Sequence, residues 1–146
     1  MKYNRYPKRD PIKNYFPLPN EIFYLGLSSG EISVYSYLLY REDRKTFQCY
    51  PSYKTIGSAL KISKNTVRKY VAGLEEKGLI TTGPTQVYKN DGKRYNGNLR
   101  YTIRPIEEAK EQYFQVQMHQ AELAQAQADA KRRLEEYDRK QRNKAV

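Results

Sequence analysis

The sequence predicts a protein that is mainly α with a small β-hairpin, in which one domain is followed by a long C-terminal helix. Three observations indicate this fold class. Apolar residues at helical spacing follow three helix-start signals, an alternating pattern near residue 100 is typical of a strand, and the chain from residue 106 onward contains neither Pro nor Gly. With 146 residues and 38 % hydrophobic content, the chain has material for one modest core.

Charge divides the chain into three parts. The 27 Lys and Arg residues exceed the 16 Asp and Glu residues, for a net charge of +11. Residues 106–146 hold eight basic and eight acidic residues, so the whole excess lies in residues 1–105. Residues 1–20 contain five basic residues and four Pro without any periodicity. We therefore expect a basic N-terminal arm at 1–20, a folded domain at 21–105 and a C-terminal helix at 106–146.

Composition excludes several classes of protein. The longest apolar stretch, Ile22–Leu27, has six residues, whereas a membrane span needs about 20. The single Cys49 forms no internal disulfide and no apolar leader follows the basic start, which favours a cytoplasmic location. With one His and one Cys, the chain lacks the residues for a zinc site or a nucleophile with its base. We expect neither enzymatic activity nor a cofactor or metal.

The first helix of the domain is predicted by a capping box. Ser28 and Glu31 are spaced so that each side chain can bond the other's backbone N–H. The apolar residues that follow share one helix face: Ile32, Tyr35, Leu38 and Leu39.

Two further helices follow in close succession. The second begins after Ser52 and ends near Lys61, and its apolar positions are Ile56, Ala59 and Leu60. The third begins after Ser63 and is closed by Gly78. Its apolar stripe consists of Val67, Tyr70, Val71 and Leu74, and its opposite face of Lys64, Asn65, Arg68 and Lys69.

A hairpin completes the domain. Leu99, Tyr101 and Ile103 alternate with polar residues, as in a strand with one buried face. Residues 79–82 are its expected partner. Turn signals at Asn90-Asp91-Gly92 and Asn96-Gly97 predict a long, basic hairpin loop between the two.

The second and third helices form a helix-turn-helix pattern. Five residues hold positions that must be buried to fix the angle between the helices (Ile56, Leu60, Ile62, Val67 and Tyr70), and Gly57 is small where the helices approach closest. With Pro51-Ser52-Tyr53, Thr66-Val67-Arg68 and residues 74–80 (LEEKGLI), residues 16–104 resemble bacterial winged helix-turn-helix domains. The match is closest to those of phages, plasmids and conjugative elements, some of them in replication proteins. The resemblance implies double-stranded DNA binding.

One residue departs from the family's pattern. The turn of these domains often has Gly where this chain has Lys61. A residue other than Gly tolerates positive φ poorly, which predicts a slightly wider turn.

The resemblance also implies which residues meet DNA. Asn65 and Arg68 are the candidates for base edges, since Asn suits adenine and Arg suits guanine. Phosphate contacts fall to Lys64, Lys69 and the hydroxyls of Ser52, Ser63 and Thr66. The wing residues Lys89, Lys93 and Arg94 would lie on the backbone or minor groove. The arm residues Lys2, Arg5, Lys8, Arg9 and Lys13 form a further candidate contact.

The C-terminal segment has a weak heptad pattern. One seam position holds Ile106, Tyr113, Gln120, Gln127 and Leu134, and the other holds Ala109, Val116, Leu123, Ala130 and Tyr137. A parallel two-stranded coiled coil that makes a homodimer is one interpretation. A single long helix, or a helix that binds a partner such as a replication protein, is the other.

These observations favour a sequence-specific duplex DNA-binding protein in transcription regulation or replication initiation on a mobile element. Two alternatives stay open. In the first, the winged domain and the tail are an adaptor in replication or partition that binds proteins. In the second, the tyrosines and the basic arm bind single-stranded nucleic acid or RNA.

Overall fold

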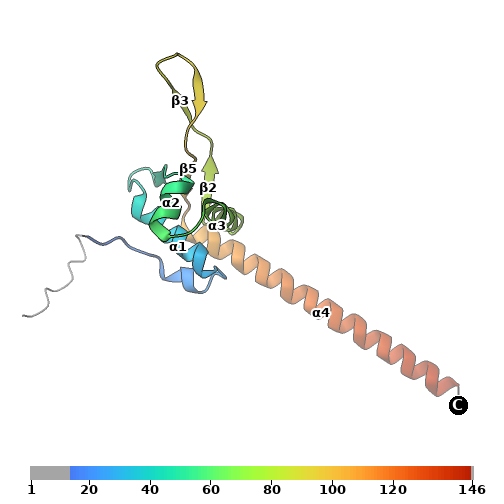
Figure 1. Ribbon diagram of the computed structural model, residues 1–146. Coiled ribbons are helices and arrows are strands. Elements are labelled where there is room, and N and C mark those ends of the chain that lie inside the picture. Colours follow the sequence, from blue (N-terminus) through green and yellow to red (C-terminus); the bar gives the residue numbers. More distant parts are fainter. Residues whose placement is uncertain (1–13, 146) are drawn as a thin grey trace, which may run out of the picture.

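The computed structural model describes residues 14–145. In chain order, its elements are η1 (Asn20–Phe23), α1 (Ser29–Arg41), β1 (Gln48–Cys49), α2 (Tyr53–Leu60), α3 (Lys64–Glu76), β2 (Ile80–Gly83), β3 (Gln86–Tyr88), β4 (Arg94–Asn96), β5 (Arg100–Ile103) and α4 (Ile106–Lys144). The predicted fold class is confirmed, because a winged helix-turn-helix domain is followed by one long helix (Figure 1). The basic residues expected in the N-terminal arm lie outside the described residues.

The three helices of the domain begin in the same way. Ser28, Ser52 and Ser63 each accept a hydrogen bond through Oγ from the backbone N–H three residues later, at 3.0–3.2 Å. The predicted capping box is present, since Glu31 Oε1 also accepts from the Ser28 backbone N–H at 2.9 Å. These bonds satisfy N–H groups that the first helical turn leaves free.

The core lies between α1, α2, α3 and the sheet. Its fully buried members include Tyr35, Leu38, Ile56, Leu74 and Tyr101. The prediction that Ala59 belongs to this core is wrong, because Ala59 is exposed and Gly57 is buried in its place. Gly57 packs closely against the Ile62 carbonyl. The buried face of α2 therefore contains Ile56 and Gly57, with the half-buried Leu60 beside them.

The sheet contains the predicted hairpin and one additional strand. β5 pairs with β2, with Thr82 opposite Tyr101, and on its other side with the short β1, with Cys49 opposite Tyr101. Both pairings are antiparallel. The loop predicted between β2 and β5 forms a ribbon of its own, in which β3 pairs with β4 and Val87 lies opposite Tyr95. This ribbon projects from the domain as the wing (Figure 1).

The long helix α4 touches the domain only at its start. Ala109 is 1 % exposed, and Ile106 and Tyr113 pack against the core beside it. The Gln112 amide donates to the Glu76 carbonyl at the end of α3. From there α4 runs away from the domain (Figure 1), with Leu123, Leu134 and Tyr137 half exposed or more. Within residues 14–145, no helix is both long and apolar enough to cross a membrane.

Candidate nucleic-acid interface

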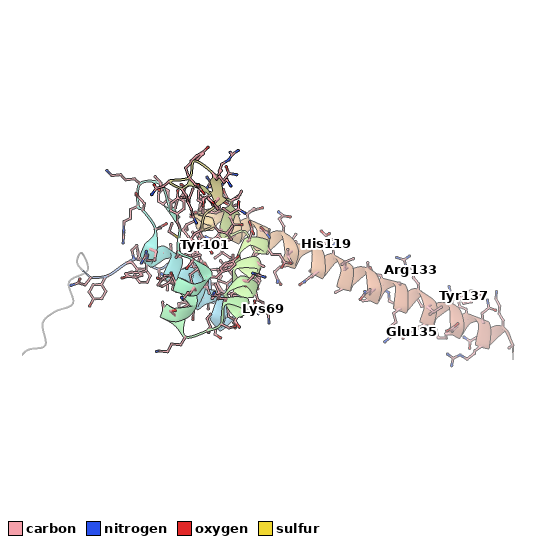
Figure 2. All side chains as sticks on the ribbon, turned by 45° about the horizontal axis from the view of Figure 1, so that its top comes forward. Lys69, Tyr101, His119, Arg133, Glu135 and Tyr137 are labelled. Carbon is pink, nitrogen blue, oxygen red and sulfur yellow. The ribbon has the colours of Figure 1, made fainter. Side chains whose placement is uncertain are left out.

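The outer face of α3 presents a compact polar surface. Lys64, Asn65, Arg68 and Lys69 are exposed, while Val67, Val71 and Leu74 on the opposite side are buried. Figure 2 shows Lys69 at the outside of the domain and Tyr101 within it. The first two turns of α3 therefore offer two amines, a guanidinium and an amide to solvent, on a helix whose other face is fixed in the core.

The turn between α2 and α3 is held by Lys61 and Gly57. Lys61 adopts the left-handed conformation, with φ 58° and ψ 45°. The backbone N–H groups of Lys61 and Ile62 both donate to the Gly57 carbonyl, the second at 3.0 Å. A Cβ on Gly57 would collide with the Ile62 carbonyl. Since Lys61 itself takes the positive φ that Gly favours, the turn keeps a left-handed residue at this position, and the reason for expecting a wider turn no longer applies.

Two close contacts set the position of α3 against α1. A Cβ on Gly30 would collide with the Tyr70 ring, and one on Gly73 would collide with the Glu31 carboxylate. Because Gly30 and Gly73 are small, α1 and α3 approach closely enough for Lys77 Nζ to lie 2.7 Å from Glu31 Oε1. Burial alone would raise the pKa of Glu31, but Lys77 and the Ser28 N–H and hydroxyl together hold that pKa below its ordinary value.

The candidate base-reading arginine has a partner on the neighbouring helix. The Arg68 guanidinium carbon lies 5.7 Å from the centre of the Tyr53 ring, within the range of a cation–π interaction. Tyr53 is the first residue of α2 and follows Ser52 directly. The contact brings the exposed side of α3 next to the start of α2, so that Ser52 and Arg68 belong to one surface. Sequence reasoning did not identify Tyr53 as a partner of Arg68.

The hydroxyls at the helix starts are hydrogen-bonded in pairs. Ser63 Oγ lies 2.8 Å from Thr66 Oγ1, and Ser52 Oγ lies 2.9 Å from Thr55 Oγ1. Each serine oxygen already accepts from a backbone N–H. If the threonine hydroxyl also donates to it, the serine hydroxyl hydrogen remains available to an external acceptor such as a phosphate oxygen.

The basic residues of the wing are all exposed but differ in their contacts. Lys89 Nζ lies 4.3 Å from the centre of the Tyr95 ring, and Arg94 Nη1 donates to Gln86 Oε1 at 2.7 Å. For Lys93 the structure gives a bond of the backbone only, from its N–H to Asp91 Oδ1. The three cations therefore lie around the end of the β3–β4 ribbon.

An Asp91 contact stiffens the turn of the wing. Asp91 Oδ2 accepts from the Tyr95 hydroxyl at 2.6 Å, and its Oδ1 accepts from the Lys93 N–H at 2.9 Å. The tyrosine hydroxyl and this N–H lower the pKa of Asp91, and the same carboxylate raises the pKa of Tyr95. Gly92 follows with φ 74°, which completes the turn.

Among residues 14–145, no three His, Cys, Asp or Glu side chains gather as a metal site would require.

Comparison with known proteins finds a similarity over part of the domain. Residues 25–80 match the family model described as a helix-turn-helix domain. This range contains α1, α2 and α3 and ends at the first residue of β2, so the wing and α4 lie outside it. No curated protein matches the chain.

One similar solved structure is a possible transcriptional regulator from Methanosarcina mazei Go1. It is 21 % identical, with 72 % of this chain and 80 % of that chain covered at a TM-score of 0.48.

Proposed function

We propose that this protein binds double-stranded DNA sequence-specifically and acts in the cytoplasm, in transcription regulation or in replication initiation on a mobile element. The observation that carries this proposal is the exposed face of α3. Its four polar or basic residues, Lys64, Asn65, Arg68 and Lys69, stand on a helix that Gly30, Gly57 and Gly73 let pack tightly against its neighbours. A rigid helix with such a face has the geometry that enters the major groove.

Within this interface, two residues read bases. Asn65 offers an amide that can pair with adenine N6 and N7, and Arg68 offers a guanidinium that can pair with guanine O6 and N7. In the free protein Arg68 lies against Tyr53. The aromatic ring can therefore orient the guanidinium before DNA arrives, which reduces the rotamer entropy lost on binding.

The remaining candidates bind phosphates. Lys64 and Lys69 flank the base-reading pair, and the hydroxyls of Ser52, Ser63 and Thr66 lie at the starts of α2 and α3. Because Ser63 and Thr66 are hydrogen-bonded to one another, one of these two hydroxyls at a time has its hydrogen free for a phosphate. Helix starts carry partial positive charge, which favours phosphate there. Lys89, Lys93 and Arg94 would extend this contact along the backbone or minor groove through the wing.

Affinity and partners follow from the charge and from α4. A net charge of +11 in this chain favours DNA at low salt whatever the sequence. A homodimer formed through α4 would bring two recognition helices to one DNA and raise specificity. In a replication role, the same helix would instead hold a replication protein.

Footprinting on the DNA upstream of the protein's own gene tests the proposal. Wild-type protein should protect a defined site. The Asn65→Ala/Arg68→Ala variant should lose that protection. The matched variant Asn20→Ala/Arg44→Ala removes the same two side-chain types from exposed positions outside α2, α3, the wing and α4, and it should keep the protection. Unchanged protection by the α3 variant would show that α3 does not read the sequence.

A further inference from the structure

The face of α4 that packs on the domain continues along the helix as a mostly apolar seam, interrupted by Gln120 and Gln127. Ala109 and Tyr113 of this seam pack on the domain, whereas Val116, Leu123 and Leu134 are 45 %, 50 % and 62 % exposed. Arg133 and Tyr137 stand out from a part of α4 that has no other helix or strand of residues 14–145 beside it (Figure 2). Because the spacing of the seam is that of a two-stranded coiled coil, its natural occupant is another helix of the same pattern.

A groove lies where the seam leaves the domain. It has a volume of about 340 Å³ and is lined by Leu25, Gly26 and Lys77 of the domain and by Tyr113, Val116 and Gln120 of α4. The domain thus forms one wall of the groove and the seam of α4 forms its floor. Any helix that pairs with the seam from Val116 onward enters this groove with one of its ends.

The position of the domain decides the direction of the second helix. Ile106, Ala109 and Tyr113 show that the domain covers the seam face over the first two turns of α4. In a parallel pair, both domains would lie at the same end, each on the face of its helix that points to the other copy, and they would obstruct one another. In an antiparallel pair, the domains lie at opposite ends and the obstruction is absent.

The charge of α4 favours the same direction. Residues 106–125 hold four Glu and one Lys, a net charge of −3, whereas residues 126–144 hold seven Lys or Arg and four Asp or Glu, a net charge of +3. A parallel pair sets like halves against one another. An antiparallel pair sets each acidic half against a basic half of the other copy, which is favourable at these short distances.

We infer that a second copy of this chain pairs with α4 in the antiparallel direction, with its C-terminal end in the groove beside Gly26 and Lys77. In an antiparallel pair, residues at one seam position pack against residues at the other seam position of the second copy, which gives one natural register. In this register Leu123 meets Leu134 of the second copy, Gln120 meets Tyr137, Gln127 meets Ala130, and Val116 meets Gln141. The strongest apolar pair therefore forms twice, and Tyr137 reaches the mouth of the groove.

This arrangement rests on the homodimer within the proposed function and adds its direction, register and docking groove. It also fixes how the two DNA-binding domains are spaced. The starts of the paired segments lie about 25 residues apart along the coiled coil, or about 38 Å at 1.5 Å per residue. The C-terminal end of each α3 is bonded to Gln112, which lies outside the paired segment. These two ends are therefore further apart along the coiled coil than the roughly 34 Å between half-sites on neighbouring turns of DNA.

Distances between spin labels in the full chain, without DNA, test the inference. One variant carries a label at Asn143→Cys and the control carries one at Ala128→Cys, near the centre of the register. Cys49 is 3 % exposed, and burial raises the pKa of its thiol to about 11, so it does not compete for the label. The antiparallel pair predicts a separation of about 44 Å for the two Asn143→Cys labels and under about 25 Å for Ala128→Cys.

Each outcome decides between arrangements. Short separations at both positions would establish a parallel pair and overturn the inference. Absence of dipolar coupling at both positions in concentrated protein would overturn pairing through α4 altogether, and with it the homodimer. Because DNA is absent, neither result bears on whether α3 reads DNA, which footprinting tests separately.

Discussion

Lys77 Nζ lies 2.7 Å from Glu31 Oε1, and this ion pair joins the end of α3 to the start of α1. Lys77 Nζ also donates to the Gly26 carbonyl at 3.1 Å. Gly26 in turn lies under the Tyr113 ring of α4, because a Cβ there would meet the ring at 3.2 Å. One lysine thus connects the end of α3, the start of α1 and the loop that α4 covers.

Removing Lys77 should destabilise the domain. Lys77→Met leaves the Glu31 carboxylate, which is 7 % exposed, without its cation. We expect a loss of about 1–2 kcal/mol in the free energy of unfolding, a value reduced from that of a fully buried pair because Lys77 is 37 % exposed. Urea denaturation measures it. The matched Lys69→Met, on the exposed face of the same helix, should change stability by less than about 0.5 kcal/mol, and equal effects of the two variants would contradict the prediction.

The same pair predicts the sign of one pH effect. Because the pKa of Glu31 is lowered in the folded protein, its contribution is present above its ordinary pKa and is lost as the pH falls through the lower folded value. The stability difference between wild type and Glu31→Gln should therefore shrink as the pH is lowered from about 6 to about 3. A difference that grows over this range would mean that burial, which raises the pKa, outweighs Lys77.

The left-handed Lys61 predicts a stabilising substitution. Lys61→Gly removes the strain of a side chain at φ 58° and should raise the free energy of unfolding by about 0.5–1 kcal/mol, after the greater flexibility of Gly in the unfolded chain is subtracted. Thermal denaturation measures the change. Ala59→Gly, two residues earlier on the exposed side of α2, should lower stability by about 0.5–1 kcal/mol. A loss with both variants would show that Lys61 is not strained.

The wing should contribute affinity without specificity. Replacing Lys89, Lys93 and Arg94 together by Ala removes three exposed cations and should weaken binding to every duplex alike. Each lost phosphate contact lowers the salt slope of log K by about 0.9, so the slope should fall by up to about 2.7. A salt slope equal to that of wild type would remove the wing from the interface.

The register of α4 can be tested by complementation. Leu123→Glu and Leu134→Lys should each yield monomers, because each buries a charge in the seam. Mixed in equal amounts they should form heterodimers in the antiparallel register, where Glu at 123 meets Lys at 134 of the other copy and the remaining two leucines meet. Sedimentation velocity measures the masses. In a parallel pair the two charges never meet, and the mixture would stay monomeric.

The helices of the domain were predictable because their signals are local. Ser28, Ser52 and Ser63 each cap a helix that starts where the sequence indicates, and the spacing of Val67, Val71 and Leu74 identifies the buried face of α3. Helical spacing places Ala59 on the buried face of α2, and this is wrong because close packing at Gly57 also sets the rotation of the helix.

Long-range contacts were not predictable from the sequence. The two-residue β1 carries no strand pattern, and its pairing with β5 depends on residues more than 50 positions away. The contact of Arg68 with Tyr53 depends on the angle between two helices. In the wing, residues 90–92 predict the turn. The ribbon strands on either side have only a short alternation as their signal, in Gln86-Val87-Tyr88 and Arg94-Tyr95-Asn96.

The most direct test of sequence-specific binding is fluorescence anisotropy over a salt series. The probes are a labelled duplex from the region upstream of the protein's own gene, a scrambled duplex of equal length and the corresponding single strand. We predict that the native duplex stays bound near physiological salt while the other two dissociate. The ratio of the affinity for the native duplex to that for the scrambled duplex should fall about 10-fold or more in Arg68→Ala. Dissociation of all three at the same salt concentration would contradict sequence-specific recognition by α3.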